Sequence, residues 1–305
     1  MQVISKDIKR ILVRQHYKLV GNHSAVKLCH WLKKSLLDKN FCYKQKFYGI
    51  CSHRCMQFTP AVVFCSQKCL FCWRDTEYTL KYKKENFDEP EFIFEEAIKA
   101  QRSLLSGYGG IPDRVNMKKL KEAQNPTNVA ISLSGEPTIY PKISELIEIF
   151  HRKNFTTFLV TNGTFPEVLE RMKMPTQLYI SLVAPTEEYY RRICNPLILD
   201  GWEKFNTSLE LFPSLETKKV VRLTLVKGLN DILPKEYAKL IEKAEPDFLE
   251  VKSYMFLGGS RKRLSLENMP SFEECKNFAE KINEFLNYNF KDEKKDSRVV
   301  LLSKK

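Results

Sequence analysis

The 305-residue sequence has no apolar run that approaches the roughly 20 residues of a membrane-spanning helix. It has no internal repeat, and its polar, basic N-terminus lacks the apolar segment of a signal peptide. These absences argue against an integral membrane protein, an exported protein and a repeat protein. We therefore expect a cytoplasmic globular protein with no membrane partner, and a hydrophobic content of 43% allows a sizeable core.

Acidic residues are scarce at the N-terminus. Residues 1–50 contain eleven Lys or Arg but only Asp7 and Asp38 as acids, a local charge of +9 within a total of +13. Such a density of positive charge is typical of a surface that binds a polyanion such as nucleic acid. The plainer alternative is a solvated lysine-rich face.

Cysteines are numerous and clustered, since seven of the nine lie between Cys29 and Cys72. A small secreted protein would use that many in disulfides, but this chain is long and has no export signal. The clustering instead favours a metal protein in a reducing compartment. We expect Cys194 and Cys275, which lie on helical segments, to be small buried residues of the core.

Three of these cysteines, Cys65, Cys69 and Cys72, have the spacing C-x-x-x-C-x-x-C. Three thiolates this close in sequence can bind one iron–sulfur cluster, whose four irons need four ligands. One iron then stays open for a small chelating ligand, as the open position of a catalytic zinc does. A three-cysteine zinc knot or a loop that only stabilises the fold is the alternative.

This spacing resembles the signature of the radical S-adenosylmethionine (SAM) enzymes, including Phe71 before the third cysteine. Ser134-Gly135-Glu136-Pro137 is similar to the Gly-Gly-Glu-Pro element of the same enzymes. The resemblance implies a [4Fe–4S] cluster whose open iron binds SAM, with Ser134, Gly135 and Glu136 at the amino group of SAM. Asn162 and Ser181 stand where the family places hydrogen bonds to SAM, although each of them also fits a polar residue that only satisfies a loop.

Six short apolar segments alternate with helical patterns and predict parallel strands over Thr59–Phe64, Asn128–Leu133, Thr156–Thr161, Gln177–Val183, Val220–Val226 and Phe248–Met255. Alternating β and α units predict a parallel sheet with right-handed crossovers. Six units fall short of a closed eight-stranded barrel, so we expect an α/β fold, a partial (β/α)6 barrel of the radical SAM type. The motifs above all follow strands, and the ends of parallel strands meet at one rim.

The N-terminal part is expected to be a separate extension. Residues 4–20 and 25–37 have helical spacing, and they belong to a basic helical segment, 1–56, that carries the second set of cysteines. The barrel then occupies residues 57–305, with a last helix over Phe272–Leu286 and a terminal strand over Arg298–Leu302.

The second set is Cys29, Cys42 and Cys55, each thirteen residues after the one before. Residues 41–60 read FCYKQKFYGICSHRCMQFTP, and together with Arg222–Lys227 and Pro246–Lys252 they resemble the short archaeal form of the 4-demethylwyosine synthases. The similarity runs from about residue 25 to the C-terminus. Unlike the family pattern, this chain has Cys51 close to Cys55, so either of the two is a candidate ligand.

The resemblance implies a radical SAM enzyme that converts 1-methylguanosine next to the anticodon of tRNA-Phe to 4-demethylwyosine, with pyruvate as the two-carbon donor. Cys29, Cys42 and Cys55 would hold a second [4Fe–4S] cluster that binds pyruvate. Lys44 would either form a Schiff base with pyruvate or pair with an anionic group. Because the chain has no room for the flavodoxin-like domain of eukaryotic members, an external reductase, flavodoxin or ferredoxin would supply electrons to a monomer.

Several basic residues are candidates for contacts with tRNA, namely Arg10, Arg14, Arg54, Arg261, Lys262 and Arg263. Arg54 lies, with His53, either near the second cluster or on a phosphate. One alternative function is a radical SAM enzyme with an auxiliary cluster that acts on a peptide or small metabolite. Another is a zinc-containing RNA-binding module that is not an enzyme.

Overall fold

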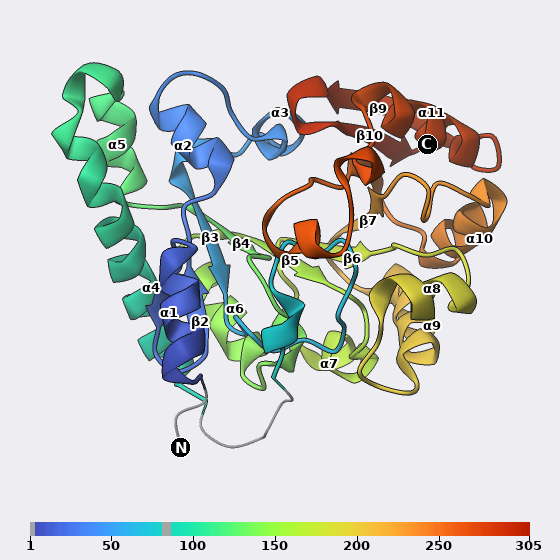
Figure 1. Ribbon diagram of the computed structural model, residues 1–305, viewed down its shortest axis with the longest axis horizontal. Coiled ribbons are helices and arrows are strands. Elements are labelled where there is room, and N and C mark those ends of the chain that lie inside the picture. Colours follow the sequence, from blue (N-terminus) through green and yellow to red (C-terminus); the bar gives the residue numbers. More distant parts are fainter. Residues whose placement is uncertain (1–3, 81–86) are drawn as a thin grey trace. The chain divides into compact units, whose positions relative to one another are not determined.

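The computed structural model describes residues 4–80 and 87–305 (Figure 1). By its internal contacts the chain divides into two compact units. The first unit is Met1–Phe64, Leu80–Val160 and Met172–Thr176, and the second is Cys65–Thr79, Thr161–Arg171 and Gln177–Lys305. These units differ from the expected division into an extension, 1–56, and a barrel, 57–305, which was defined by function and stays a prediction. Within the described residues, no helix is both long and apolar enough to cross a bilayer.

Among the described residues of the first unit, the strands lie side by side in the order of the sequence: β1 (Lys18–Val20), β2 (Ser24–Val26), β3 (Cys55–Thr59), β4 (Asn128–Ile131) and β5 (Thr156–Thr161). The pairs β1·β2 and β2·β3 are antiparallel, whereas β3, β4 and β5 are parallel. Met56 pairs in register with Val129, and both are fully buried. The parallel strands are apolar on both faces, as expected where helices cover the sheet.

The helices in the described part of this unit are α1 (Lys6–Arg14), α2 (His30–Leu36), α3 (Tyr43–Tyr48), α4 (Pro90–Leu105), α5 (Met117–Ala123) and α6 (Ile143–Arg152). The long helix α4 begins at a proline, which suits a first helical position because its missing N–H would have no partner there. It packs on α6, where the Phe94 and Phe150 rings meet edge to face with centroids 5.2 Å apart. Burial of such aromatic surface fixes α4 and α6 to the sheet.

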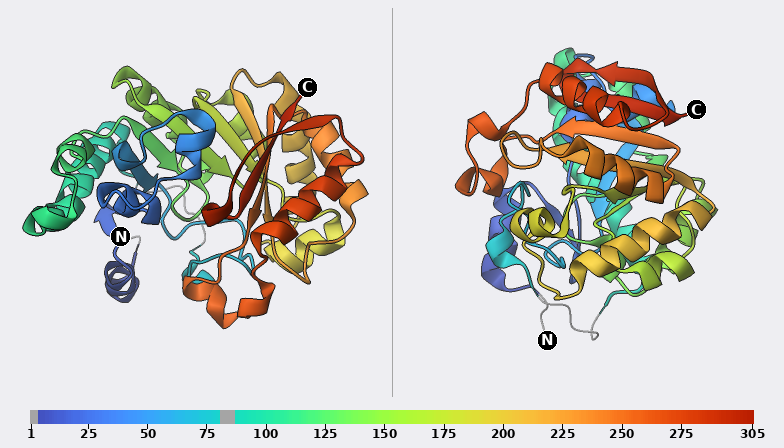
Figure 2. Two further views of the ribbon diagram at one scale, coloured as in Figure 1. Left: turned by 90° about the horizontal axis from the view of Figure 1, so that it is seen from above. Right: turned by 90° about the vertical axis from the view of Figure 1, so that its right-hand side faces the viewer.

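The second unit contains the other three parallel strands, β6 (Gln177–Ser181), β7 (Lys218–Leu225) and β8 (Phe248–Ser253). Two antiparallel strands, β10 (Val299–Lys304) and β9 (Tyr288–Lys294), extend it beyond β8. Its helices are α7 (Pro166–Arg171), α8 (Glu187–Cys194), α9 (Gly201–Leu211), α10 (Pro234–Ala244) and α11 (Phe272–Asn283). The last helix, red in Figure 2, packs on β8 and β10. The predicted α/β class is thus confirmed, with three parallel strands in each unit.

The first predicted strand was placed wrongly. The strand is β3, Cys55–Thr59, and not Thr59–Phe64. Residues 60–64 are equally apolar but form a buried loop, in which the Val62 N–H donates to the His23 carbonyl and the Phe64 N–H to the Ala61 carbonyl. Periodicity cannot separate an apolar loop from a buried strand, and Pro60 cannot donate to a ladder.

The two N-terminal helices are shorter than predicted. The helix over 4–20 ends at Arg14, and residues 18–20 form β1. The helix over 25–37 begins only at His30, because residues 24–26 form β2. Strands of three residues are too short to show a period of two, so only the pairing of β1 with β2 and of β2 with β3 reveals them.

Candidate active site

The cysteine loop, residues 65–72 of the second unit, lies along the end of α8. The Lys68 N–H donates to the Cys194 carbonyl at 3.0 Å, and the Leu70 N–H donates to the Ile193 carbonyl at 2.9 Å. The sulfurs of this loop are half-buried. The C-x-x-x-C-x-x-C trio is therefore carried by a loop whose backbone is fixed by hydrogen bonds rather than by a helix or strand.

Within this loop, Cys69 lies against Cys194 at the end of α8. A hydrogen bond with Cys194, followed by burial, raises the pKa of Cys69 well above its ordinary value. The thiol also donates to Gln67 Oε1 at 3.2 Å, and Gln67 Nε2 in turn donates to the Tyr190 hydroxyl at 2.8 Å. Iron binding at Cys69 must therefore displace a proton. Cys194 and Cys275 are buried, as predicted.

Asn162, at the end of β5, reaches the cysteine loop. Its Nδ2 donates to Ser66 Oγ at 2.9 Å and lies 3.8 Å from Cys65 Sγ. Its Oδ1 accepts hydrogen bonds from the N–H and hydroxyl of Thr164, at 3.1 and 2.7 Å. These contacts hold the amide beside the first cysteine. Ser66 and Thr164 were not predicted, and their hydroxyls are 2.7 Å apart.

Phe71 and Ser181 lie in the same unit. Phe71 packs with Cys69 against Val183, Ala184, Tyr190 and Cys194, just beyond the end of β6. Ser181 is the last residue of β6 and pairs in register with Arg222 on β7, whose Nε donates to the buried Glu250 at 2.8 Å. Both residues therefore stand at or just beyond the ends of parallel strands, where the fold class places ligands.

The Ser134–Glu136 turn follows β4 in the first unit and is pressed onto the segment that leads into the cysteine loop. The Glu136 N–H donates to the Phe64 carbonyl at 2.8 Å, and the Ser134 hydroxyl donates to the Val62 carbonyl at 3.0 Å. Gly135 has φ +71°, and a Cβ there would lie 1.8 Å from the Ala61 carbonyl oxygen. Only glycine allows this approach of two backbones.

Glu136 itself is 2% exposed, and its Oε1 accepts hydrogen bonds from the N–H and hydroxyl of Thr138, at 3.2 and 2.7 Å. A buried carboxylate that is oriented in this way suits recognition of a ligand's ammonium group. The geometry therefore fits the role that the sequence suggested for the Ser134–Glu136 turn.

The second trio comes from three elements of the first unit. Cys29 is the N-cap of α2, Cys42 is the N-cap of α3, and Cys55 is the first residue of β3. Burial, followed by the neighbouring Cys42, raises the pKa of Cys29 to about 11. Burial and then Cys29 and Cys42 raise the pKa of Cys55 as well. These effects on Cys29 and Cys55 place the three thiols near one another, although each cysteine stands thirteen positions after the one before.

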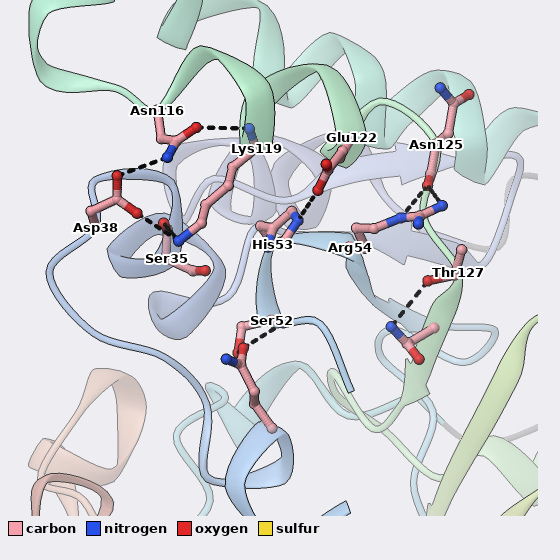
Figure 3. A network of polar contacts seen from close by, with 12 residues as sticks. Ser35, Asp38, Ser52, His53, Arg54, Asn116, Lys119, Glu122, Asn125 and Thr127 are labelled. Atoms are coloured by element: carbon pink, nitrogen blue, oxygen red, sulfur yellow. Dashed lines mark hydrogen bonds and ion pairs between the residues drawn. The ribbon is translucent and has the colours of Figure 1, made fainter. Parts of the chain in front are cut away.

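Cys51 and Cys55 differ in their surroundings. Cys51 is exposed, whereas Cys55 is buried beside the other two thiols. The intervening turn is anchored by Ser52, whose Oγ accepts from the Cys42 N–H and donates to Gln45, both at 2.8 Å. His53 Nε2 lies 2.7 Å from the Glu122 carboxylate (Figure 3). The arrangement favours Cys55 over Cys51 as the third ligand.

Lys44 lies on α3 and is only 6% exposed. Its Nζ stands 4.1 Å from the centroid of the Phe158 ring on β5. Burial raises the pKa of Cys55, and the charge of Lys44 partly offsets this rise, so the amine lies near that thiol. By contrast, Lys46 on the same helix is exposed.

Among the described residues, no three His, Cys, Asp or Glu side chains are arranged to hold one metal ion.

The basic residues proposed to contact RNA have different surroundings. Arg14 and Arg261 are exposed, and Arg10 forms an exposed ion pair with Asp7 at 3.3 Å. Arg54 donates from Nε and Nη2 to the Asn125 carbonyl, at 3.2 and 3.1 Å (Figure 3). Lys262 and Arg263 instead contact the loop after Cys69, with Lys262 pairing with Asp75 at 3.0 Å. The Gly258-Gly259 pair precedes these residues and allows the loop to pack closely against Trp73 and Arg74. The sequence shows the two glycines, but only the fold shows which segment they approach.

Two family models match the chain: the radical SAM superfamily over residues 59–241, and wyosine base formation over residues 243–304. The S-adenosyl-L-methionine-dependent tRNA 4-demethylwyosine synthase of Pyrococcus horikoshii is 54% identical over 303 residues, which cover 97% of this chain and 88% of that protein. The synthase of Methanocaldococcus jannaschii is 44% identical, covering 98% and 96%. A solved structure of TYW1 with a lysine–pyruvate adduct bound superposes with a TM-score of 0.91, at 42% identity and 99% and 96% coverage.

Proposed function

The chain belongs to the radical SAM superfamily and, within it, to the tRNA 4-demethylwyosine synthases, and we propose that it makes the tricyclic base 4-demethylwyosine from 1-methylguanosine beside the anticodon of tRNA-Phe. Pyruvate is the proposed two-carbon donor. The observation that carries this proposal is a second cysteine trio with a buried amine, Lys44, beside it. A radical SAM enzyme that only generates a radical needs neither feature.

The first trio would hold the SAM-binding [4Fe–4S] cluster, which supplies the electron for cleavage of SAM when it is bound. Around it, the chain's own residues position the substrate. Gly135 allows the turn after β4 to pack closely against the segment before Cys65, and Glu136 presents an oriented carboxylate for the amino group of SAM. Asn162 presents its amide at Cys65.

Cys29, Cys42 and Cys55 would hold a second [4Fe–4S] cluster, and this cluster would bind pyruvate near Lys44. We propose that Lys44 attacks the ketone carbon, with loss of water, to form a Schiff base. An amine is a nucleophile only when unprotonated, and burial disfavours the charged form. The Phe158 ring favours the cation, so a purely electrostatic contact with the carboxylate is the competing role for Lys44. The adduct in the solved relative supports the covalent role.

Trapping with borohydride tests this step. The reconstituted protein is incubated with pyruvate and borohydride, which reduces an imine to a stable amine, and its mass is measured. The wild type and Lys46→Arg, a change at the exposed lysine of the same helix, should gain the adduct, whereas Lys44→Arg should not gain it and should make no product. Full activity of Lys44→Arg would assign the residue an electrostatic role only.

The substrate is tested directly by supplying tRNA-Phe with and without the 1-methyl group. Product that appears only with the methylated tRNA and pyruvate supports the proposal, whereas turnover of a peptide or small metabolite without tRNA affinity would replace it. Electrons are proposed to come from an external flavodoxin, ferredoxin or reductase. We further propose a monomer in the cytoplasm, where thiols stay reduced.

A further inference from the structure

Residues 258–263 of the second unit lie directly against the cysteine loop of that unit. Arg263 Nε donates a hydrogen bond to the Leu70 carbonyl at 3.1 Å. Its Nη2 donates to the carbonyls of Cys72 and Arg74, the latter at 3.3 Å. One guanidinium therefore binds three carbonyls that bracket the third cysteine of the trio. The rigid planar arrangement of guanidinium donors suits such a multiple contact, which a lysine ammonium cannot reproduce.

Two glycines bring the backbones together. Gly258 has φ +54°, and a Cβ there would lie 2.2 Å from the Trp73 carbonyl oxygen. A Cβ at Gly259 would lie 2.7 Å from the Arg74 carbonyl oxygen, and the Gly259 N–H donates to the Trp73 carbonyl at 2.8 Å. The loop thus packs against residues 73 and 74 without intervening side chains.

The base of the loop is fixed independently of these contacts. Ser260 is fully buried, and its hydroxyl accepts from the Tyr254 hydroxyl at 2.9 Å and donates to the Leu257 carbonyl at 2.6 Å. Its carbonyl accepts the Arg263 N–H at 2.9 Å. The guanidinium is therefore presented by a loop that is ordered by its own hydrogen bonds.

We propose that Arg263 is a positioning residue for the SAM-binding cluster: it fixes the peptide at Cys72 and places a positive charge beside that ligand, which raises the reduction potential of the cluster. The inference rests on the proposed function, because it takes Cys65, Cys69 and Cys72 as the cluster ligands. A cluster's potential depends on nearby charge and on hydrogen bonding around its ligands. A nearby cation favours the reduced, more negative cluster.

The experiment uses full-length protein in which Cys29, Cys42 and Cys55 are changed to Ala, so that only the first cluster forms. In this background Arg263→Gln, Arg263→Lys and Arg261→Gln are compared by iron release to EDTA and by a redox titration followed by electron paramagnetic resonance, without tRNA. Arg261 lies in the same loop but is exposed and stacks on Phe256, so it is the matched control for charge.

Arg263→Gln should release iron about tenfold faster, because charge-assisted hydrogen bonds are stronger than neutral ones, and should show a lower midpoint potential. Arg263→Lys should also release iron faster but keep a potential close to that of the background protein. Arg261→Gln should change neither quantity.

Unchanged iron release and potential in Arg263→Gln would overturn the inference alone, and so would an equal shift in Arg261→Gln. A background protein that binds no iron would overturn the proposed function, and the inference with it. If Arg263→Gln does not fold, as judged by circular dichroism, Arg263→Lys decides: faster iron release supports the inference and unchanged release rejects it.

Discussion

The two cysteine trios are brought together in different ways. Cys65, Cys69 and Cys72 lie within eight residues, on one loop whose backbone is bonded to the end of α8. Cys29, Cys42 and Cys55 span 27 residues and stand at the starts of three elements, α2, α3 and β3. The first trio is brought together by chain connectivity, and the second only by the packing of the first unit.

The difference has a chemical counterpart. The first loop contacts a buried cysteine, Cys194, and accepts hydrogen bonds from the Arg263 guanidinium, and we propose that it holds the cluster that cleaves SAM. The second trio lies near a buried amine, Lys44, and burial raises the pKa of Cys29 to about 11. The buried amine is the group that we propose reacts with pyruvate.

Removal of each trio should give the largest and most distinct effects. Changing Cys65, Cys69 and Cys72 to Ala should abolish SAM cleavage and leave about four of about eight irons. Changing Cys29, Cys42 and Cys55 to Ala should leave the same iron count and some uncoupled SAM cleavage, but no tricyclic product. Iron and sulfide analysis with chromatography of 5′-deoxyadenosine checks both. Two clusters in either variant would show that the ligands are assigned wrongly.

Substitution of one glycine near each trio tests how tightly the backbone is packed there. Gly135 and Gly49 have nearly the same backbone angle, φ +71° and +74°, but only Gly135 is crowded by a carbonyl. Gly135→Ala should lower the free energy of unfolding by more than about 4 kcal/mol, because Cβ and backbone would overlap. Gly49→Ala should cost only the strain of a left-handed residue, about 1–2 kcal/mol. Urea unfolding of both variants measures this, and equal losses would contradict the crowding at Gly135.

The identity of the third ligand in the second trio can be tested with single changes. Cys55→Ser should lose the second cluster and the product, because the buried thiol faces Cys29 and Cys42. Cys51→Ser should keep both, because that thiol is exposed. Iron content and product yield distinguish them, and the reverse pattern would assign the cluster to Cys51.

The smallest expected effect concerns charge on the first unit. Arg10 and Arg14 are exposed. An exposed ion pair such as Arg10–Asp7 contributes little to the free energy of folding, so Arg10 can leave Asp7 and bind a phosphate. Changing both residues to Glu should weaken tRNA binding and flatten the slope of log K against log salt by about two. Fluorescence anisotropy at several salt concentrations measures the slope. An unchanged affinity would remove this helix from the RNA surface.

Local patterns in the sequence were enough to place five of the six predicted parallel strands. The predicted Thr156–Thr161 strand is β5, and the strand from Gln177 begins where predicted. The short strands β1 and β2 escaped prediction because they are recognised only by the pairing of β1 with β2 and of β2 with β3.

The sequence by itself determined the first trio, since a spacing of three and two residues confines three thiols to one loop, and it determined the alternating strands and helices through their periodicity. Only the tertiary structure brought Cys29, Cys42 and Cys55 together and placed Lys44 near Cys55. It also showed that Arg263 donates a hydrogen bond to the Cys72 carbonyl, 191 residues away in the chain. Contacts over such separations depend on how the elements pack, and no local pattern of residues encodes that packing.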